Sequence, residues 1–226
     1  SSASPATYSG ALTLTAAARI NADAGELTIS GNASGNFALT FGGFSNLTYS
    51  GVRSGTSTIV KDGISTLTLS NGNSSYTGAT TISVGTVKLG AISVGGTNSP
   101  LGTTGGATAI TAGARLDLNG FSLGIAEPIT NLNGVGYGLG DFASGAIMNS
   151  SGSAVTFTGL ITLGAASTIK ADYGDINLTA AGTITGSGFG LTLGGSGTGT
   201  LASIIGTVAG TITKIGTGTW TVSGQS

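Results

Sequence analysis

A strand–turn–strand motif that occurs twice constrains this chain more than any other feature. Its longer copy spans residues 59–90 and reads IVKDGISTLTLSNGNSSYTGATTISVGTVKLG, and its first half returns at residues 212–224 as ITKIGTGTWTVSG. In both copies apolar residues alternate with Thr or Ser, and Gly, Asn and Ser separate the alternating segments. Such a unit cannot bury its own apolar face and becomes stable by stacking on similar units. The motif therefore predicts a β-solenoid.

The composition has to be weighed against disorder, because 43 of the 226 residues are Gly. Disordered chains combine low hydrophobicity with high net charge. Here 39% of the residues are hydrophobic, 7% are charged and the formal net charge is −1, so the composition favours a folded chain. The low charge, without a run of Lys or Arg, also argues against a nucleic-acid or anionic-membrane partner.

Two missing residue types narrow the possible chemistry. The sequence contains no Cys and no His, which excludes disulfides, thiolate or His-ligated zinc sites and the His-dependent catalytic triads. We expect no cofactor. No apolar run approaches the length of about 18 residues that a membrane-spanning helix needs, so we expect a chain that does not span a membrane. There is no initiating Met or signal-like segment, which is typical of a mature product or an excised piece.

Outside residues 134–153 the hydrophobic period is two residues, which predicts strands and no helix. The candidates share apolar or β-branched residues on one face and are bounded by Gly, Asn or Ser. They are Ala11–Thr15, Glu26–Ser30, Phe37–Phe41, Leu47–Tyr49, Thr66–Ser70, Thr80–Val84, Thr86–Leu89, Ala107–Thr111, Ala114–Leu118, Ala154–Thr158, Asp175–Thr179, Gly190–Leu193, Thr200–Ile204 and Gly218–Val222.

We predict a single all-β segment over residues 1–226, a parallel β-helix (β-solenoid) of about ten coils with roughly 20–25 residues per coil. Apolar residues stack inside, Thr and Ser cover the outside, and almost no charge is buried. A β-sandwich is the alternative, but the short, Gly-rich connections leave few loops long enough for Greek-key crossings.

The longer copy, followed by residues 107–120, resembles the passenger-associated transport repeat of bacterial autotransporter passengers. Most of that pattern is present: Lys61, Gly63, Thr66–Ser70, Tyr76, Gly78, Gly85, Thr86, Leu89, Gly90 and Leu116–Gly120. The close resemblance covers about a third of the chain. It implies a secreted or surface-exposed right-handed β-helix, often part of a larger adhesin. The C-terminal translocator of such proteins has no counterpart in the sequence.

The best candidate for catalysis is the pair Asp172 and Asp175, beside Lys170 and Tyr173. Some β-helices cleave polysaccharides with two or three carboxylates on one face, and a carboxylate pair is also a weak candidate for Ca²⁺. We favour a third interpretation, a Gly-containing turn in which the Asp side chains cap the backbone. We therefore expect no enzymatic activity and no metal site.

A binding surface is predicted within residues 134–153, where the alternation is lost. In a solenoid, an insertion of this kind leaves the coil on one side, and this one carries Tyr137, Asp141 and Phe142 as candidate ligand contacts. A purely structural loop is the alternative.

The two ends of the chain resemble the halves of one repeat. Residues 7–10 (TYSG) resemble the segment around Tyr76, and Trp220 stands at the position that Leu67 holds in the longer copy. The end of a solenoid normally carries a polar cap, and neither end shows one. We expect the segment to continue into further copies of itself, covalently or as a head-to-tail filament, with an arbitrary boundary as the alternative. The expected interface residues are Tyr8, Leu12, Leu14, Trp220 and Val222.

These features together predict a structural stalk or fibre unit at the bacterial cell surface. The alternatives are a passenger that adheres to glycans or host surfaces through residues 134–153 or an exposed aromatic residue, and a polysaccharide-active enzyme centred on Asp172 and Asp175.

Overall fold

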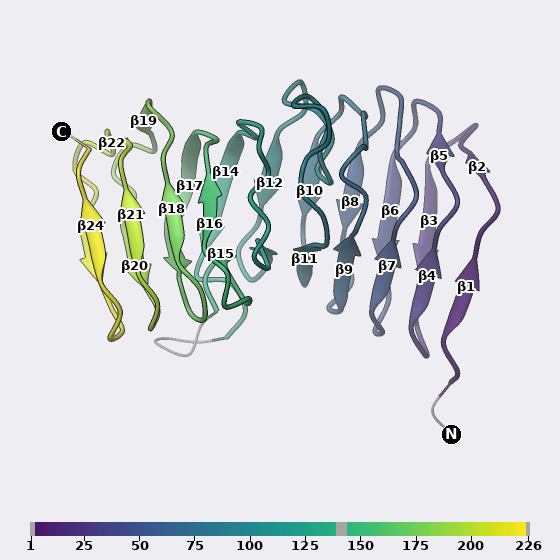
Figure 1. Cartoon of the computed structure of the whole chain (residues 1–226), viewed down its shortest axis with the longest axis horizontal. Helices are drawn as coiled ribbons and strands as arrows, with labels where there is room; N and C mark the ends of the chain where they lie inside the picture. Colours follow the sequence, from purple (N-terminus) through teal and green to yellow (C-terminus); the bar gives the residue numbers. More distant parts are fainter. Residues whose placement is uncertain (1–2, 139–143, 225–226) are drawn as a thin grey trace.

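Parallel strands of successive coils stack in register along one axis, as the computed structural model shows for residues 3–138 and 144–224 (Figure 1). The described residues form no helix. The chain makes a β-solenoid of about ten coils, which confirms the predicted fold class. The N- and C-terminal strands lie at opposite ends of the rod (Figure 1).

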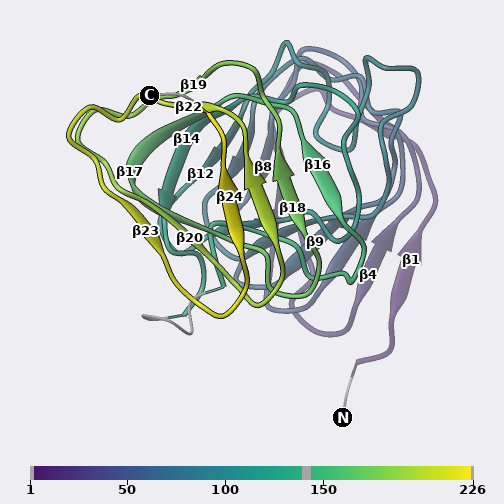
Figure 2. The same ribbon diagram turned by 60° about the vertical axis from the view of Figure 1, so that its left-hand side comes forward.

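Each coil has three faces, which Figure 2 separates by turning the molecule. Face 1 contains β1 (Ala6–Tyr8), β4 (Leu27–Ile29), β7 (Leu47–Tyr49), β9 (Thr66–Leu69), β11 (Thr86–Leu89), β13 (Arg115–Asp117), β15 (Ile147–Met148), the second part of β17 (Ile161–Lys170), β20 (Leu191–Gly194) and β23 (Ile212–Lys214). Face 2 begins with β2 (Leu12–Thr13) and β5 (Ala33–Ser34) and ends with β16 (Val155–Phe157), β18 (Ile176–Leu178), β21 (Gly199–Leu201) and β24 (Trp220–Val222). Face 3 contains β3 (Ala18–Asn21), β6 (Leu39–Gly42), β8 (Ile59–Lys61), β10 (Thr80–Ile82), β12 (Thr108–Ile110), β14 (Ile129–Gly134) and the first part of β17, and it continues into β19 (Thr183–Ile184) and β22 (Ile204–Ile205).

Stacked apolar residues fill the interior. On face 1 the eight successive strands from β4 to β20 each place one side chain of the same ladder inside the coil, because residues two apart in a strand share a face. This ladder consists of Leu27, Leu47, Leu67, Val87, Leu116, Ile147, Ile169 and Leu193. From Leu47 to Leu193 its members are buried, which confirms the predicted inward apolar stacks.

The coil length is regular in the first half of the rod and variable afterwards. Leu27, Leu47, Leu67 and Val87 pair in sequence and follow one another at intervals of 20 residues. The next two steps, from Val87 to Leu116 and from there to Ile147, take 29 and 31 residues, which is longer than predicted. One of these coils contains a turn closed by Val94 N donating to Asn98 O (3.2 Å), and the other contains the excursion described below.

Glycines allow the corners of neighbouring coils to stack backbone to backbone. At the corner between faces 1 and 2, a Cβ on Gly51 would lie 2.0 Å from the carbonyl oxygen of Gly31. At the corner between faces 2 and 3, a Cβ on Gly78 would lie 2.2 Å from the carbonyl oxygen of Ser57. Since any side chain would push the coils apart there, part of the high Gly content follows directly from the stacking.

The strand β17 joins two faces without a turn. Its first part pairs with β14 on face 3, and its last two residues, Ile169 and Lys170, pair with β15 on face 1. At this coil the corner between faces 3 and 1 is therefore bridged by continuous extended backbone.

Candidate functional site

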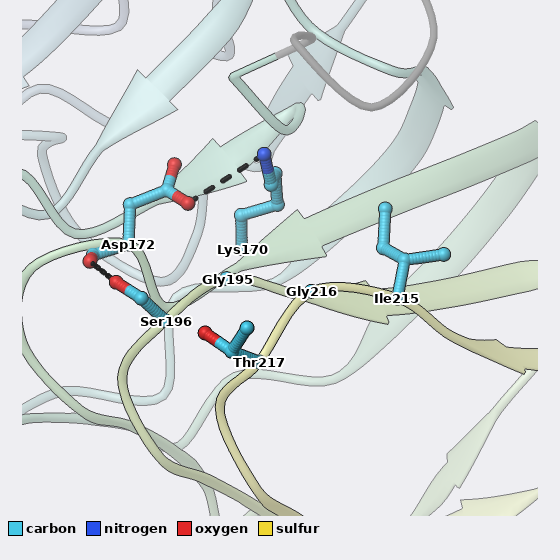
Figure 3. A pocket seen from close by; sticks show the side chains of 7 residues that line it. All are labelled: Lys170, Asp172, Gly195, Ser196, Ile215, Gly216 and Thr217. Carbon is cyan, nitrogen blue, oxygen red and sulfur yellow. Dashed lines mark hydrogen bonds and ion pairs between the residues drawn. The ribbon is translucent and has the colours of Figure 1, made fainter.

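A pocket of about 290 Å³ opens at the corner between faces 1 and 2, near the C-terminal end of the rod (Figure 3). Three consecutive coils contribute to it, so it exists only when they are stacked. Its lining consists of Lys170, Asp172, Gly195, Ser196, Ile215, Gly216 and Thr217.

The pocket combines polar side chains, exposed glycine backbone and the apolar side chain of Ile215. The Lys170 ammonium lies 3.5 Å from Oδ1 of Asp172, and both side chains are largely shielded from solvent. The Ser196 hydroxyl donates to the backbone oxygen of Asp172 and so joins two coils (Figure 3). Gly195 and Gly216 adopt positive φ values of 107° and 72°, and a Cβ on Gly216 would lie 2.6 Å from the Gly195 carbonyl oxygen.

The two candidate residues Asp172 and Asp175 lie in different surroundings and make different contacts. Asp172 lines the pocket, whereas Asp175 is not part of its lining and accepts a 2.9 Å hydrogen bond from the backbone N of Thr198 in the next coil. Hydrogen bonds from Thr198 lower the pKa of Asp175. This geometry supports the predicted capping role for Asp175. Among the described residues no group of three or more His, Cys, Asp or Glu could hold a metal ion.

The predicted excursion is shorter than residues 134–153. After β14, backbone hydrogen bonds join the described segments on either side of residues 139–143: Gly145 N donates to Val135 O (2.9 Å) and Ser144 N donates to Tyr137 O (2.8 Å). Tyr137 is 68% exposed, while Asp141 and Phe142 lie outside the described residues. The later part of the range returns to the coil, because β15 pairs on face 1 and is buried. The boundary prediction was therefore wrong on this side: a two-residue strand is too short to show alternation.

The predicted interface residues lie in the first and last coils. Tyr8 and Val222 are 47% and 45% exposed, and Leu12, Leu14 and Trp220 are half-buried. The indole nitrogen of Trp220 donates to the backbone oxygen of Gly194 (2.9 Å). Its ring covers Gly199 in the preceding coil, where a Cβ would lie 2.5 Å from the ring. Whether another copy contacts these residues stays a prediction.

The two copies of the motif occupy different corners. In the longer copy, Lys61 belongs to face 3 and Leu67 to face 1, whereas in the shorter copy Lys214 belongs to face 1 and Trp220 to face 2. The sequence equivalence of Trp220 and Leu67 is therefore not a structural equivalence. The motif specifies a strand–corner–strand unit, and more than one corner of the coil accepts it.

The same holds for the two tyrosines that sequence similarity aligned. Tyr76 is buried between β9 and β10, and its hydroxyl lies 2.6 Å from Oγ1 of Thr80. Tyr8 instead belongs to β1, pairs with Ile29 and is half exposed. Within this chain the sequence resemblance does not give the two tyrosines equivalent positions in the coil.

Four charged residues are buried, although almost no buried charge was expected: Arg53, Lys61, Asp117 and Glu127. Asp117 accepts a 2.6 Å hydrogen bond from the Ser150 hydroxyl. Arg53 donates to the backbone oxygens of Ser54, Gly35 and Phe37 at 2.8–3.1 Å. Lys61 donates to backbone oxygens at the corner between faces 3 and 1, and Glu127 accepts from Thr108 in the preceding coil. Burial lowers the pKa of Arg53, lowers that of Lys61 to about 8 and raises that of Glu127 to about 8. No sequence signal identified them, since their neighbours alternate as elsewhere.

Comparison with known proteins agrees with the solenoid. The fold is that of a parallel β-helix. Residues 59–89 and 212–226 match the family model of the passenger-associated-transport-repeat. No curated protein and no solved structure gives a significant match. The matched repeat and the β-solenoid together fit an autotransporter passenger β-helix. Repeats of this family belong to autotransporter passenger domains, which are secreted to the cell surface.

Membrane insertion through a helix has no support in the described part of the chain, where no helix is long and apolar enough to cross a bilayer.

Proposed function

We propose that this chain is a structural, non-enzymatic segment of a stalk or fibre at the bacterial cell surface. The observation that carries the proposal is the parallel pairing that runs without interruption along face 1, from β1 in the first coil to β23 in the last. Such stacking distributes load over many backbone hydrogen bonds along one axis and makes a long, narrow body. Most of the outward-facing surface carries Thr, Ser and Asn rather than charge, as suits a stalk.

The solenoid continues beyond this segment into further coils, of the same chain or of another copy. Within the described residues, β1 pairs only with β4 and β24 pairs only with β21, so each end has an unpaired strand edge. The apolar residues Leu12, Leu14 and Trp220 are only half-buried there. An added coil would pair these edges and complete the apolar stacks.

The test is a protein that contains two copies of the chain in tandem, with Trp220 of the second copy replaced by Phe. The remaining indole then reports on the junction alone, because the sequence has a single Trp. If the coil continues across the junction, its fluorescence emission shifts to the blue relative to the single chain. The tandem protein then unfolds in one cooperative transition at a higher temperature.

A matched control carries Val222→Lys in the first copy, which places a charge on the stacking edge. We expect this variant to restore the emission and the unfolding temperature of the single chain. Unshifted emission in the unmodified tandem protein, together with the unfolding temperature of the single chain, would reject the continuous solenoid.

Adhesion through the excursion is the second candidate function. Tyr137 favours it, because a 68% exposed aromatic side chain is available to a partner. Loss of binding to a glycan array in a Tyr137→Ser variant would support adhesion, and unchanged binding would assign any glycan contact elsewhere.

A further inference from the structure

We infer that the pocket of Lys170, Asp172, Ser196, Ile215 and Thr217 binds a neutral saccharide through two neighbouring hydroxyl groups. The inference does not depend on the stalk role.

The polar groups of the pocket complement a vicinal diol. A sugar hydroxyl both donates and accepts, so one hydroxyl donates to the Asp172 carboxylate while its neighbour accepts from the Lys170 ammonium. These two groups lie 3.5 Å apart, a spacing that two adjacent hydroxyls can span. The Thr217 hydroxyl lines the same pocket and makes no hydrogen bond to another residue in the described part of the chain, so it is available to a third ligand group.

The apolar lining suits the carbon face of a sugar ring. Ile215 points toward the pocket from the last coil (Figure 3). Gly195 and Gly216 expose backbone beside it and let a ligand approach closely, because they carry no side chain. A volume of about 290 Å³ stands at the lower limit of small-molecule sites, and one or two sugar rings fill such a space.

Other ligand classes fit less well. An anion would meet the positive charge of Lys170 together with the negative charge of Asp172, so the pocket offers it little net attraction. A divalent metal needs more oxygen ligands than the single carboxylate that lines the pocket. An apolar ligand would remove water from the two charged groups without offering either of them a hydrogen bond. A neutral polyhydroxylated ring is the class that satisfies both charges at once.

The shape of the site depends on register between coils. Lys170 and Asp172 come from one coil, Ser196 from the next and Thr217 from the one after, and the Ser196 hydroxyl fixes the first two by donating to the Asp172 backbone oxygen. Strand pairing on both adjoining faces holds these three coils together. On face 1 the paired strands are β17, β20 and β23, and on face 2 they are β18, β21 and β24. The pocket is therefore preorganised, which limits the ordering cost of binding.

Saturation-transfer NMR and calorimetric titration of the whole chain test the inference, with methyl α-D-mannopyranoside and methyl β-D-galactopyranoside as probes. We expect saturation transfer to at least one glycoside and a Kd of about 1–10 mM, as a few hydrogen bonds on a single ring provide. Removing one hydroxyl of the bound diol in a deoxy analogue should weaken binding about tenfold.

Two variants assign the binding to this pocket. Asp172→Asn removes the charged acceptor and Thr217→Val removes a hydroxyl at nearly constant volume, and each should weaken binding about tenfold without changing the thermal unfolding temperature. Asp23→Asn removes a carboxylate at the opposite end of the rod and should leave binding unchanged.

Any of three results would overturn the inference. The first is the absence of saturation transfer to both glycosides at tens of millimolar. The second is that the Asp172→Asn and Thr217→Val variants bind with the same affinity as the unmodified chain, and the third is that glucuronate binds more tightly than either neutral glycoside.

Discussion

The hydroxyl of Thr108 donates a 2.8 Å hydrogen bond to Oε1 of Glu127 inside the solenoid, from one coil to the next. The second carboxyl oxygen of Glu127 has no hydrogen-bond partner within the described residues, and the side chain is fully buried. Burial disfavours the charged form and raises the pKa of Glu127 from 4.5 to about 8. The interior of this rod therefore contains a carboxyl group that is protonated at neutral pH.

Stability should fall as the pH rises from about 4.5 to about 8. In this window the unfolded chain has already lost the Glu127 proton while the folded chain still holds it, so folding is opposed increasingly with pH. The full loss is on the order of 3–5 kcal/mol. Urea unfolding at pH 5 and pH 8 measures it, and Glu127→Gln should remove this part of the dependence. Equal pH dependence in both proteins would show that Glu127 does not titrate in this way.

Lys61 should give a pH dependence of the opposite sign at higher pH. Burial lowers its pKa from 10.5 to about 8, so between these values the unfolded chain binds the extra proton. Stability therefore rises with pH across that window, and the gain disappears in a Lys61→Met variant. Urea unfolding at pH 8 and pH 10 tests this, with Lys214→Met, an exposed lysine, as the control. A rise of equal size in the Lys61→Met variant would contradict the assignment.

Arg53→Met should destabilise the chain by about 3 kcal/mol. The substitution keeps much of the buried volume but leaves the carbonyls of Ser54, Gly35 and Phe37 without the guanidinium that joins two coils. Arg19→Met is the matched control, because Arg19 pairs with Asp62 on the surface and its loss should be scarcely measurable. Urea unfolding at pH 7 compares the two variants, and a similar small effect for both would show that the Arg53 hydrogen bonds do not stabilise the stacked coils.

Gly199→Val should displace the Trp220 ring from the last coil. A Cβ at residue 199 would lie 2.5 Å from the indole, and valine is larger still. We expect red-shifted tryptophan emission and a loss of about 1–3 kcal/mol, the usual cost of overpacking. Thr200→Val, which adds no bulk on the inner side of the same strand, should leave the emission unchanged. Unshifted emission in Gly199→Val would mean that the ring does not rest on this glycine.

The regular part of the fold was predictable because its physics is local. Alternation identified the strands that later form β4, β7, β9, β11, β12 and β13, since each places its apolar residues on one side. The two-residue strands β5, β15 and β19 were missed, and β22 was met at one residue only, because two residues carry no period. The longer strands β1, β3 and β14 also lie outside the candidates. The ten-residue β17 was missed as well: the segment GAAS in its middle reads as a turn, and only pairing on two faces keeps it extended.

The sites were harder to predict than the strands. The sequence alone does not predict that Lys170 and Asp172 lie close to Thr217, because their proximity depends on the number of residues in each intervening coil. Arg53, Lys61 and Glu127 lie in segments that look like the rest of the chain, and their burial follows from the stacking of neighbouring coils. Asp175, by contrast, was correctly interpreted from its Gly-containing turn, since that chemistry is confined to a few residues.

Because the two copies of the motif lie at different corners, they face different sides of the rod. If a turn sequence recurred at the same corner, all copies would lie on one side of the solenoid, and a flat partner could contact every copy at once. Here the second copy has moved one corner further round the axis. A flat surface that touches one side of the rod therefore contacts only one of the two copies.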